Sequence, residues 1–125
     1  MMSVIETDQA PSAIGPYSQG RVTGNLIYTS GQIGLDPKDM KLKETFDDQA
    51  DAIFKNLDSI LRTANSDLSQ IVKLTIYLVD MKNYASLNEI MTKALPKPYP
   101  ARTTIVVSQL PLNALVEIEA IAAKK

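Results

Sequence analysis

The sequence predicts a mixed α/β (α+β) domain in which two helices cover one face of a β-sheet. Two stretches carry apolar residues at the spacing of a half-buried helix, and several shorter runs alternate apolar and polar residues as half-buried strands do. Their order along the chain is β-β-α-β-α-β-β, with a further short edge strand near the N-terminus. Two helices suffice to cover one face of such a sheet. A chain of 125 residues fits one domain, which we place at residues 1–125.

The first part of the chain predicts short strands joined by tight turns. Met2–Ile5 fits the edge strand. Ser18–Thr23 and Leu26–Ser30 are separated by Gly24-Asn25, a pair typical of two-residue β-hairpin turns. All five glycines fall between residues 15 and 34, which indicates tight turns or close backbone contacts in that region.

Two helices are predicted from apolar stripes and their end signals. The clearer one spans Phe46–Ala64, with Thr45 as its N-cap and Asp48 three residues later. The second spans Asn83–Leu95 and stops at Pro96, which cannot continue a helix. The stripes consist of Phe46, Ala50, Ile53, Phe54, Leu57, Ile60, Leu61 and Ala64 in the first helix, and of Tyr84, Leu87, Met91 and Ala94 in the second.

The run Ile71–Val79 between the helices is rich in β-branched and aromatic residues, as a strand is. Its alternation assigns two faces. One face holds Val72, Leu74, Ile76 and Leu78, and the other holds Lys73, Thr75 and Tyr77.

The stretch Pro100–Ala122 predicts two further strands that pair as a hairpin, with Arg102 at the start of the first. In the second strand, one face holds Val116, Ile118, Ala120 and Ala122, and the other holds Leu115, Glu117, Glu119 and Ile121. Apolar residues flank the two carboxylates, which is unusual for a strand face open to water. No third helix remains to cover this face, so we expect another copy of the chain to cover it and the protein to be an oligomer.

Composition excludes several classes of partner. Hydrophobic residues make up 45% of the chain and charged residues 22%, the net charge is −1, and the pI is about 5.3. No basic run is present, so we expect no nucleic-acid partner. No segment approaches the roughly 18 apolar residues of a membrane span, and the N-terminus lacks a signal-peptide core, so we expect no membrane and a cytoplasmic location.

The absence of histidine and cysteine restricts the chemistry further. It excludes disulfides, a thiol nucleophile, a histidine base and any zinc site built on these residues, and we expect no metal site. A group that moves protons must then be a carboxylate, a tyrosine, a lysine or a bound water. No glycine-rich phosphate loop is present, so a nucleotide cofactor is not indicated.

Arg102 and a carboxylate of the last strand are the candidate reactive groups. The planar guanidinium of arginine matches a carboxylate with two parallel hydrogen bonds, so Arg102 is suited to hold a small acid. A half-buried carboxylate nearby is suited to move a proton. The residues alone do not choose between Glu117 and Glu119. Arginine and glutamate side chains also form ordinary ion pairs at interfaces, which is the alternative interpretation of these residues.

Several separated motifs resemble the Rid family of reactive-intermediate imine/enamine deaminases, and more specifically its RidA branch. The resemblance extends over almost the whole chain. The motifs are Ala10-Pro11, Ile14-Gly15-Pro16-Tyr17-Ser18-Gln19, Thr29-Ser30-Gly31-Gln32-Ile33, Pro100-Ala101-Arg102, Leu110-Pro111 and Val116-Glu117-Ile118-Glu119-Ala120-Ile121-Ala122.

The resemblance implies a chorismate-mutase-like fold that assembles as a homotrimer, with a site in each cleft between subunits. It implies hydrolysis of 2-imino or 2-aminoacrylate-type acids, such as 2-iminopropanoate and 2-iminobutanoate, to 2-keto acids and ammonia without a cofactor. Arg102 would bind the substrate carboxylate, and Glu117 would position or activate the water. The resemblance places the remaining substrate-binding residues at Tyr17, Ser30, Gly31 and Asn88.

The sequence departs from the family pattern at Thr104, where RidA-type members commonly have a cysteine. Thr104 should share a strand face with Arg102 and line the same cleft, but it supplies no thiol. The alternative function is a regulator that binds a 2-keto acid or another small carboxylate without turnover. Such a binder needs Arg102 but no buried carboxylate beside it. RNA cleavage is disfavoured by the acidic pI.

Overall fold

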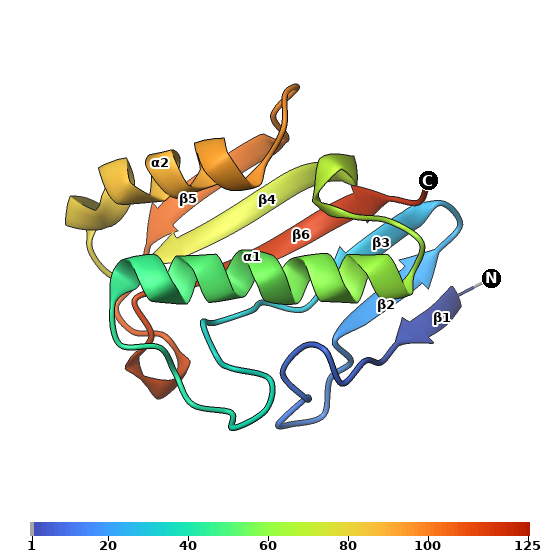
Figure 1. Ribbon diagram of the computed structural model, residues 1–125, viewed down its shortest axis with the longest axis horizontal. Coiled ribbons are helices and arrows are strands. Elements are labelled where there is room, and N and C mark those ends of the chain that lie inside the picture. Colours follow the sequence, from blue (N-terminus) through green and yellow to red (C-terminus); the bar gives the residue numbers. More distant parts are fainter. Residues whose placement is uncertain (1) are drawn as a thin grey trace.

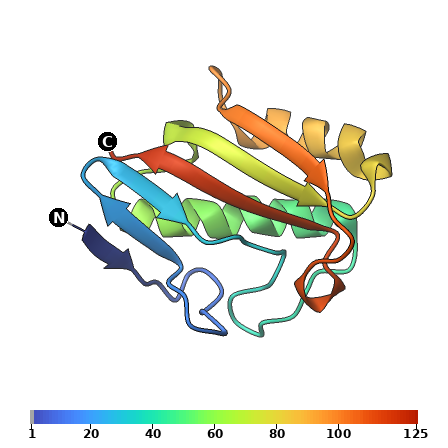
Figure 2. The same ribbon diagram turned by 180° about the vertical axis from the view of Figure 1, so that it is seen from behind.

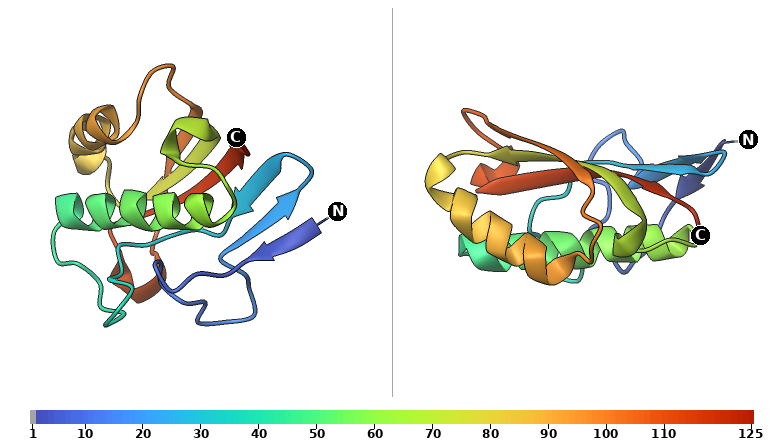
Figure 3. Two further views of the ribbon diagram at one scale, coloured as in Figure 1. Left: turned by 45° about the vertical axis from the view of Figure 1, so that its right-hand side comes forward. Right: turned by 90° about the horizontal axis from the view of Figure 1, so that it is seen from above.

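The computed structural model describes residues 2–125, which form one six-stranded sheet with two α-helices on one of its faces (Figures 1 and 3). The sheet order is β1-β2-β3-β6-β4-β5. The mixed sheet and the one-sided helices agree with the predicted fold class. The elements are β1 (Met2–Ile5), β2 (Gly20–Thr23), β3 (Leu26–Thr29), α1 (Phe46–Thr63), β4 (Ile71–Leu78), α2 (Tyr84–Ala94), β5 (Ala101–Val106) and β6 (Val116–Ala123).

Local end signals form as the sequence predicts. Thr23 pairs with Leu26 across a two-residue turn in which Gly24 has φ +57°, a left-handed conformation that glycine adopts without strain. The Thr45 side chain accepts a hydrogen bond of 3.1 Å from the Asp48 backbone N–H, which satisfies one of the free donors at the start of α1. Both predicted helices begin and end within one residue of the observed α1 and α2.

β4 contains an irregularity that the alternation pattern missed. The register shifts between Ile71 and Lys73, and the side chain of Val72 between them is 50% exposed. The prediction that Val72 shares a face with Leu74 is therefore wrong, because a bulge adds one residue to the strand and reverses the side on which the preceding residues point.

The predicted hairpin of the last two strands is also wrong. β5 pairs in parallel with β4, whereas β6 lies on the other side of β4 and pairs antiparallel with both β4 and β3. The helix α2 connects β4 to β5, and a strand-helix-strand connection of this kind places the two strands parallel. The segment between β5 and β6 then passes a turn at Pro111–Asn113 and returns the chain to the middle of the sheet.

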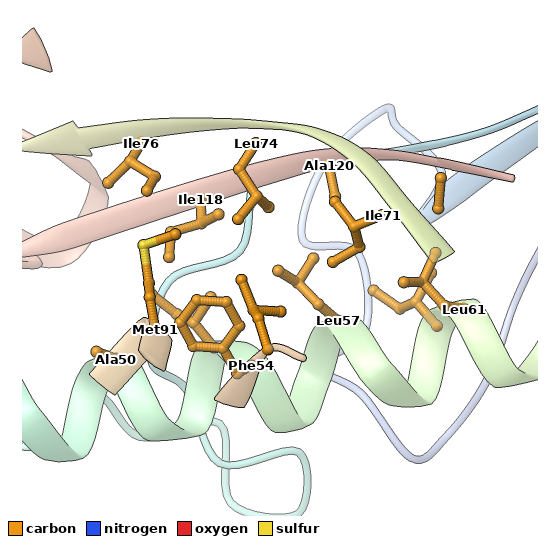
Figure 4. Close-up of a cluster of buried hydrophobic side chains, with 14 of the residues drawn as sticks. Ala50, Phe54, Leu57, Leu61, Ile71, Leu74, Ile76, Met91, Ile118 and Ala120 are labelled. Carbon is orange, nitrogen blue, oxygen red and sulfur yellow. The ribbon is translucent and has the colours of Figure 1, made fainter. Parts of the chain in front are cut away.

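The main core lies between the helices and one face of the sheet, where α1 packs its apolar stripe against β4 and β6 (Figure 4). Burying one Leu or Ile side chain contributes roughly 1.5–3 kcal/mol, so this layer supplies most of the stabilisation. Its fully buried large side chains include Ile53, Leu57, Ile60, Leu61, Leu74, Ile76 and Ile118. None of the helices within residues 2–125 has the length and apolar character needed to cross a membrane.

The opposite face of the sheet carries no helix in the part of the chain described (Figure 2). Leu26, Tyr28 and Ile105 on the strands are 38%, 44% and 44% exposed. Glu117 and Glu119 of β6 lie on this face and are half-buried, as the alternation predicts. The surface is therefore apolar around a small number of polar groups, which is typical of a surface that packs against another protein.

Gly34 allows the loop after β3 to contact the first turns of α1. A Cβ atom at this position would lie 2.5 Å from the Gln49 Cα atom and 2.7 Å from the Gln49 carbonyl oxygen. Gln49 is itself fixed, because its side chain donates to the Lys43 carbonyl at 2.9 Å and accepts from the Leu115 N–H at 2.8 Å. The overlap thus involves backbone that has no room to move.

We expect Gly34→Ala to lower the free energy of unfolding by about 1–3 kcal/mol, because the added methyl group overpacks a rigid contact. Denaturant unfolding measures this change. Gly24→Asn is the matched control, since position 24 has open space and asparagine tolerates a left-handed backbone. Equal stability of Gly34→Ala and the wild type would contradict the close contact.

Candidate functional site

Arg102 is held in one orientation by two side chains of α2. It lies on the edge strand β5 opposite Leu74, which places it on the helix-covered face of the sheet. One terminal nitrogen donates to the Asn88 Oδ1 atom at 2.7 Å, and the other donates to the Tyr84 hydroxyl at 2.6 Å. The guanidinium carbon is 5.2 Å from the centre of the Tyr84 ring, close enough for a cation–π contact. Since arginine has five N–H donors, others remain for a ligand.

The surface beside Arg102 is a small cavity of about 270 Å³. Its walls combine a charged group with apolar and aromatic ones, and they consist of Asn88, Met91, Thr92, Tyr99, Pro100 and Arg102. A small molecule with a carboxylate and a short apolar part would find partners for both in this cavity.

Thr104 shares the helix-covered face with Arg102, as expected, because the two residues are two apart on β5. Its Oγ1 atom is buried and makes no hydrogen bond with any residue in the described range. A buried hydroxyl without a partner costs free energy. No contact within residues 2–125 therefore explains why a hydroxyl group is present at position 104.

Glu117 lies on the open face of the sheet, at the edge of a second cavity of about 290 Å³. A methyl group on Gly31 would overlap the Glu117 carboxylate, so this glycine leaves the space that the carboxylate occupies. Burial, and secondarily the charge of Glu119, raises the pKa of the Glu117 carboxyl. The cavity is lined by Pro11, Ser12, Ile14, Tyr17, Ser30, Gly31, Gln32, Ile33, Leu35, Pro111 and Glu117.

Tyr17 and Ser30 line this cavity with their hydroxyl groups already engaged. The Tyr17 hydroxyl accepts a hydrogen bond of 3.2 Å from the Ile14 N–H, and the Ser30 hydroxyl donates one of 2.5 Å to the Ser18 carbonyl. The first bond lies within the loop before β2, and the second holds that loop against the segment after β3. Both residues thus shape the cavity wall, and their predicted contact with substrate stays a prediction.

The two carboxylates of β6 differ in their surroundings. The Tyr77 hydroxyl donates a hydrogen bond of 2.7 Å to the Glu119 Oε1 atom. Glu117 accepts no hydrogen bond from the residues described and faces the cavity beside Gly31. The geometry therefore favours Glu117 over Glu119 as the carboxylate available to a ligand.

The predicted site residues form two separate groups within one chain. Asn88, Arg102 and Thr104 lie on the helix-covered side of β5, and the group around Glu117 lies on the opposite face. Tyr77 pairs with both Glu117 and Ile105, so Arg102 is three residues along the strand and two strands across from Glu117. These steps correspond to roughly 10 Å in each direction. A single chain does not bring Arg102 and Glu117 into one cavity.

Tyr84 and Tyr77 were not among the predicted site residues. Tyr84 precedes Asn88 by four residues, so the two share one face of α2 and meet the same guanidinium. That spacing was a usable signal. Tyr77 has no such local signal, because its contact with Glu119 depends on the pairing of β4 with β6. Within residues 2–125 no three carboxylates lie close enough together to hold a metal ion.

Residues 7–124 match the family described as Endoribonuclease L-PSP. The chain belongs to this family. Among the L-PSP relatives, the chloroplastic Reactive Intermediate Deaminase A of Arabidopsis thaliana is 45% identical over 120 residues, which cover 95% of this chain and 64% of the Arabidopsis protein. A RutC family protein of Aquifex aeolicus is 46% identical over 125 residues, which cover 98% of this chain and all of that protein.

A crystal structure of RidA from the Antarctic bacterium Psychrobacter sp. PAMC 21119 superposes with a TM-score of 0.96 at 43% identity, covering 97% of this chain and 98% of that chain. These matches confirm the predicted Rid family and its chorismate-mutase-like α+β fold. The family description names an endoribonuclease, whereas the Arabidopsis relative is named a deaminase and is chloroplastic. The cytoplasmic location therefore stays a prediction.

We expect Glu117→Gln to stabilise the protein at neutral pH and to have less effect in acid. The raised pKa means that folding favours the protonated carboxyl, whose ordinary value is 4.5. The stabilisation from the protonated Glu117 carboxyl is fully present below pH 4.5 and is lost as the pH rises through the pKa of the folded protein. Glutamine cannot ionise, so it does not incur this loss. Thermal unfolding at about pH 4 and about pH 7.5 measures the difference. Glu44→Gln, which removes one charge from an exposed side chain, is the control. A Glu117→Gln protein no more stable than the wild type at the higher pH would refute this expectation.

We expect Thr104→Val to raise the free energy of unfolding by about 1 kcal/mol, because valine has the same shape and lacks the unpaired hydroxyl. Chemical denaturation tests this change. Thr103→Val changes the neighbouring exposed residue in the same way and is the matched control. Loss of stability in Thr104→Val would show that the hydroxyl has a partner in the assembled protein.

Proposed function

We propose that this protein is a cofactor-free deaminase that hydrolyses 2-imino and 2-aminoacrylate-type acids to 2-keto acids and ammonia. The preferred substrates in this proposal are of the 2-iminopropanoate and 2-iminobutanoate type. The observation that carries it is the contrast between an oriented arginine with free donors and a carboxylate of raised pKa that has no partner in its own chain. The Arabidopsis relative is named a reactive-intermediate deaminase, which supports deamination in general.

Arg102 binds the carboxylate of the substrate in this proposal. Tyr84 and Asn88 fix the guanidinium before the ligand arrives, so little side-chain freedom is lost on binding. Charge-assisted hydrogen bonds of this kind contribute roughly 1.5–3 kcal/mol each. Thr104 lies on the same face, but its hydroxyl is buried and does not line the cavity, so its predicted contact with the bound acid stays a prediction.

Glu117 accepts a proton from the attacking water and later donates it to the leaving nitrogen in this proposal. The water oxygen bonds to C2 of the protonated imine while a water proton passes to the Glu117 carboxylate. The same proton then passes to the nitrogen, the C–N bond breaks, and ammonia leaves. The remaining hydroxyl proton passes to the freed Glu117 carboxylate and from there to solvent as the keto group forms. A carboxyl pKa that burial raises above its ordinary value suits both transfers.

The complete site requires two copies of the chain in this proposal, with Arg102 of one copy beside Glu117 of another in a homotrimer. Two observations favour it: the two groups lie on opposite faces of the sheet, and the face around Glu117 exposes apolar side chains. Packing of that face against the edge strand of a neighbour would cover the apolar surface and bring the groups together.

The alternative function is a regulator that binds a small carboxylic or 2-keto acid. It is favoured by the arginine clamp, which is complete without Glu117. A binder has no need of a half-buried carboxylate whose pKa is raised, so the two functions differ in the role of Glu117. The endoribonuclease in the family description is a third activity, and the net charge of −1 offers little attraction for RNA.

We expect the protein to accelerate formation of the keto acid from freshly generated 2-iminopropanoate, and Arg102→Ala to lose this acceleration because the carboxylate has no clamp. Keto-acid release is followed with a coupled dehydrogenase. Arg62→Ala, an exposed arginine of α1, is the control and should retain full activity. Keto-acid binding without acceleration would establish the regulator instead, and RNA cleavage by the same preparation would support the third activity.

Mixing two inactive variants tests whether the site is shared. Arg102→Ala and Glu117→Gln, unfolded and reassembled together, should recover activity, because some interfaces then combine an intact Arg102 with an intact Glu117. Random assembly makes about a quarter of the sites complete. Light scattering should report a trimer. A monomer, or no recovery of activity on mixing, would refute the shared site.

A further inference from the structure

The open face of the sheet carries a second carboxylate that the proposed reaction does not use. Glu119 follows Glu117 by two residues on β6, so both side chains leave the same face of the strand. Their Cα atoms are roughly 7 Å apart. Two carboxylates at this distance repel each other, and no basic side chain forms an ion pair with either within residues 2–125.

Tyr77 fixes the position of Glu119. The Tyr77 residue pairs directly with Glu117 across β4 and β6, and its hydroxyl extends to Glu119, to which it donates at 2.7 Å. The hydrogen bond to Glu119 and burial raise the pKa of the Tyr77 hydroxyl, so the phenol remains a proton donor at neutral pH. Glu119 is thus held against Tyr77 and is not among the residues that line the cavity beside Gly31.

Few other titratable groups face Glu117. From β6 the neighbour is Glu119, from β4 it is Tyr77, and from the loop before β2 it is Tyr17 in the shared cavity. The segment after β3 contributes Ser30, Gly31 and Gln32, which do not titrate. Lys73 lies further along β4, opposite Ile121. Under the proposed function, Arg102 of a second copy approaches from the other side of the cavity.

We propose that Glu119, held in place by Tyr77, is a positioning residue for Glu117, whose neighbouring charge sets how readily the Glu117 carboxylate takes up and returns a proton. This inference rests on the proposed function and adds a residue that adjusts the Glu117 carboxyl in the same site. The negative charge of Glu119 disfavours a second negative charge at Glu117, so the base can accept the water proton and still deliver it to the leaving nitrogen. Tyr77 prevents Glu119 from entering the cavity, where it would compete for the water.

The decisive experiment titrates the Glu117 carboxyl directly, by carbon NMR of the protein labelled at its glutamate side chains, with Glu117→Gln used to assign the signal. Glu119→Gln should move the Glu117 titration to lower pH by about 0.5–1 unit. Glu44→Gln, the matched charge removal at an exposed site, should leave it in place. An unchanged Glu117 titration in Glu119→Gln would overturn the proposal. Because no substrate is present, this result does not depend on whether the protein is a deaminase.

Tyr77→Phe tests the positioning step separately. The phenylalanine keeps the ring and removes the hydroxyl, so Glu119 is no longer held. In the Tyr77→Phe background, Glu119→Gln should shift the Glu117 titration by less than half as much as in the wild type. An equal shift in both backgrounds would show that Tyr77 has no part in it.

The pH dependence of kcat/KM gives the functional readout. A general base must be ionised to act, so the rate rises with pH through its pKa. In Glu119→Gln this rise should occur about 0.5–1 unit lower than in the wild type, with the trimer intact by light scattering. A lower rate without any movement along the pH axis would indicate a structural role only and would refute the tuning. Absence of deaminase activity in the wild type would refute the proposed function and leave the titration result standing.

Discussion

The position of β6 between β3 and β4 determines where each candidate site residue lies. Its buried face supplies Val116, Ile118 and Ala120 to the core, all at or near zero exposure. Strict alternation then forces Glu117 onto the opposite face, away from the helices. β5 is displaced to the edge of the sheet by the same arrangement, and its Arg102 turns towards α2. Packing of the core therefore separates the arginine from the carboxylate.

The electrostatics of the two groups follow from this separation. Arg102 has hydrogen-bond partners in its own chain and lies at an edge where a ligand can approach. Glu117 has none among the described residues, and burial disfavours its charge. An unpaired, half-buried carboxylate lowers the stability of the folded chain at neutral pH. Such a group is commonly found where a reaction or a binding partner compensates for it.

Features that depend on neighbouring residues could be predicted from the sequence. The turn at Gly24-Asn25, the Thr45 cap and the apolar stripe of α1 each have a local physical cause, and all three form. The order of β5 and β6 and the exposure of Val72 depend on pairing between distant segments, which periodicity does not encode. A rule of connection was available for β5, since a helix between two strands favours parallel pairing.

The candidate site residues likewise divide into those that local motifs indicate and those whose positions depend on the pairing of distant strands. Of the predicted site residues, Asn88 and Arg102 line one cavity, and Tyr17, Ser30, Gly31 and Glu117 line the other. The spacing within α2 would have added Tyr84. The separation of Arg102 from Glu117 required the sheet order, and the contact of Tyr77 with Glu119 required the register of β4 against β6. Residue identity was readable from motifs, whereas the face and the partner of each side chain were consequences of the whole sheet.

Under the proposed function, the site is divided between copies of the chain, so the catalyst is only as abundant as its assembled form. Below the dissociation constant of a trimer, the concentration of complete sites falls with about the third power of the free chain concentration. Activity per molecule then rises steeply with expression level, and newly made chains remain inactive until they meet. In the proposed homotrimer, abundance itself would act as a threshold switch.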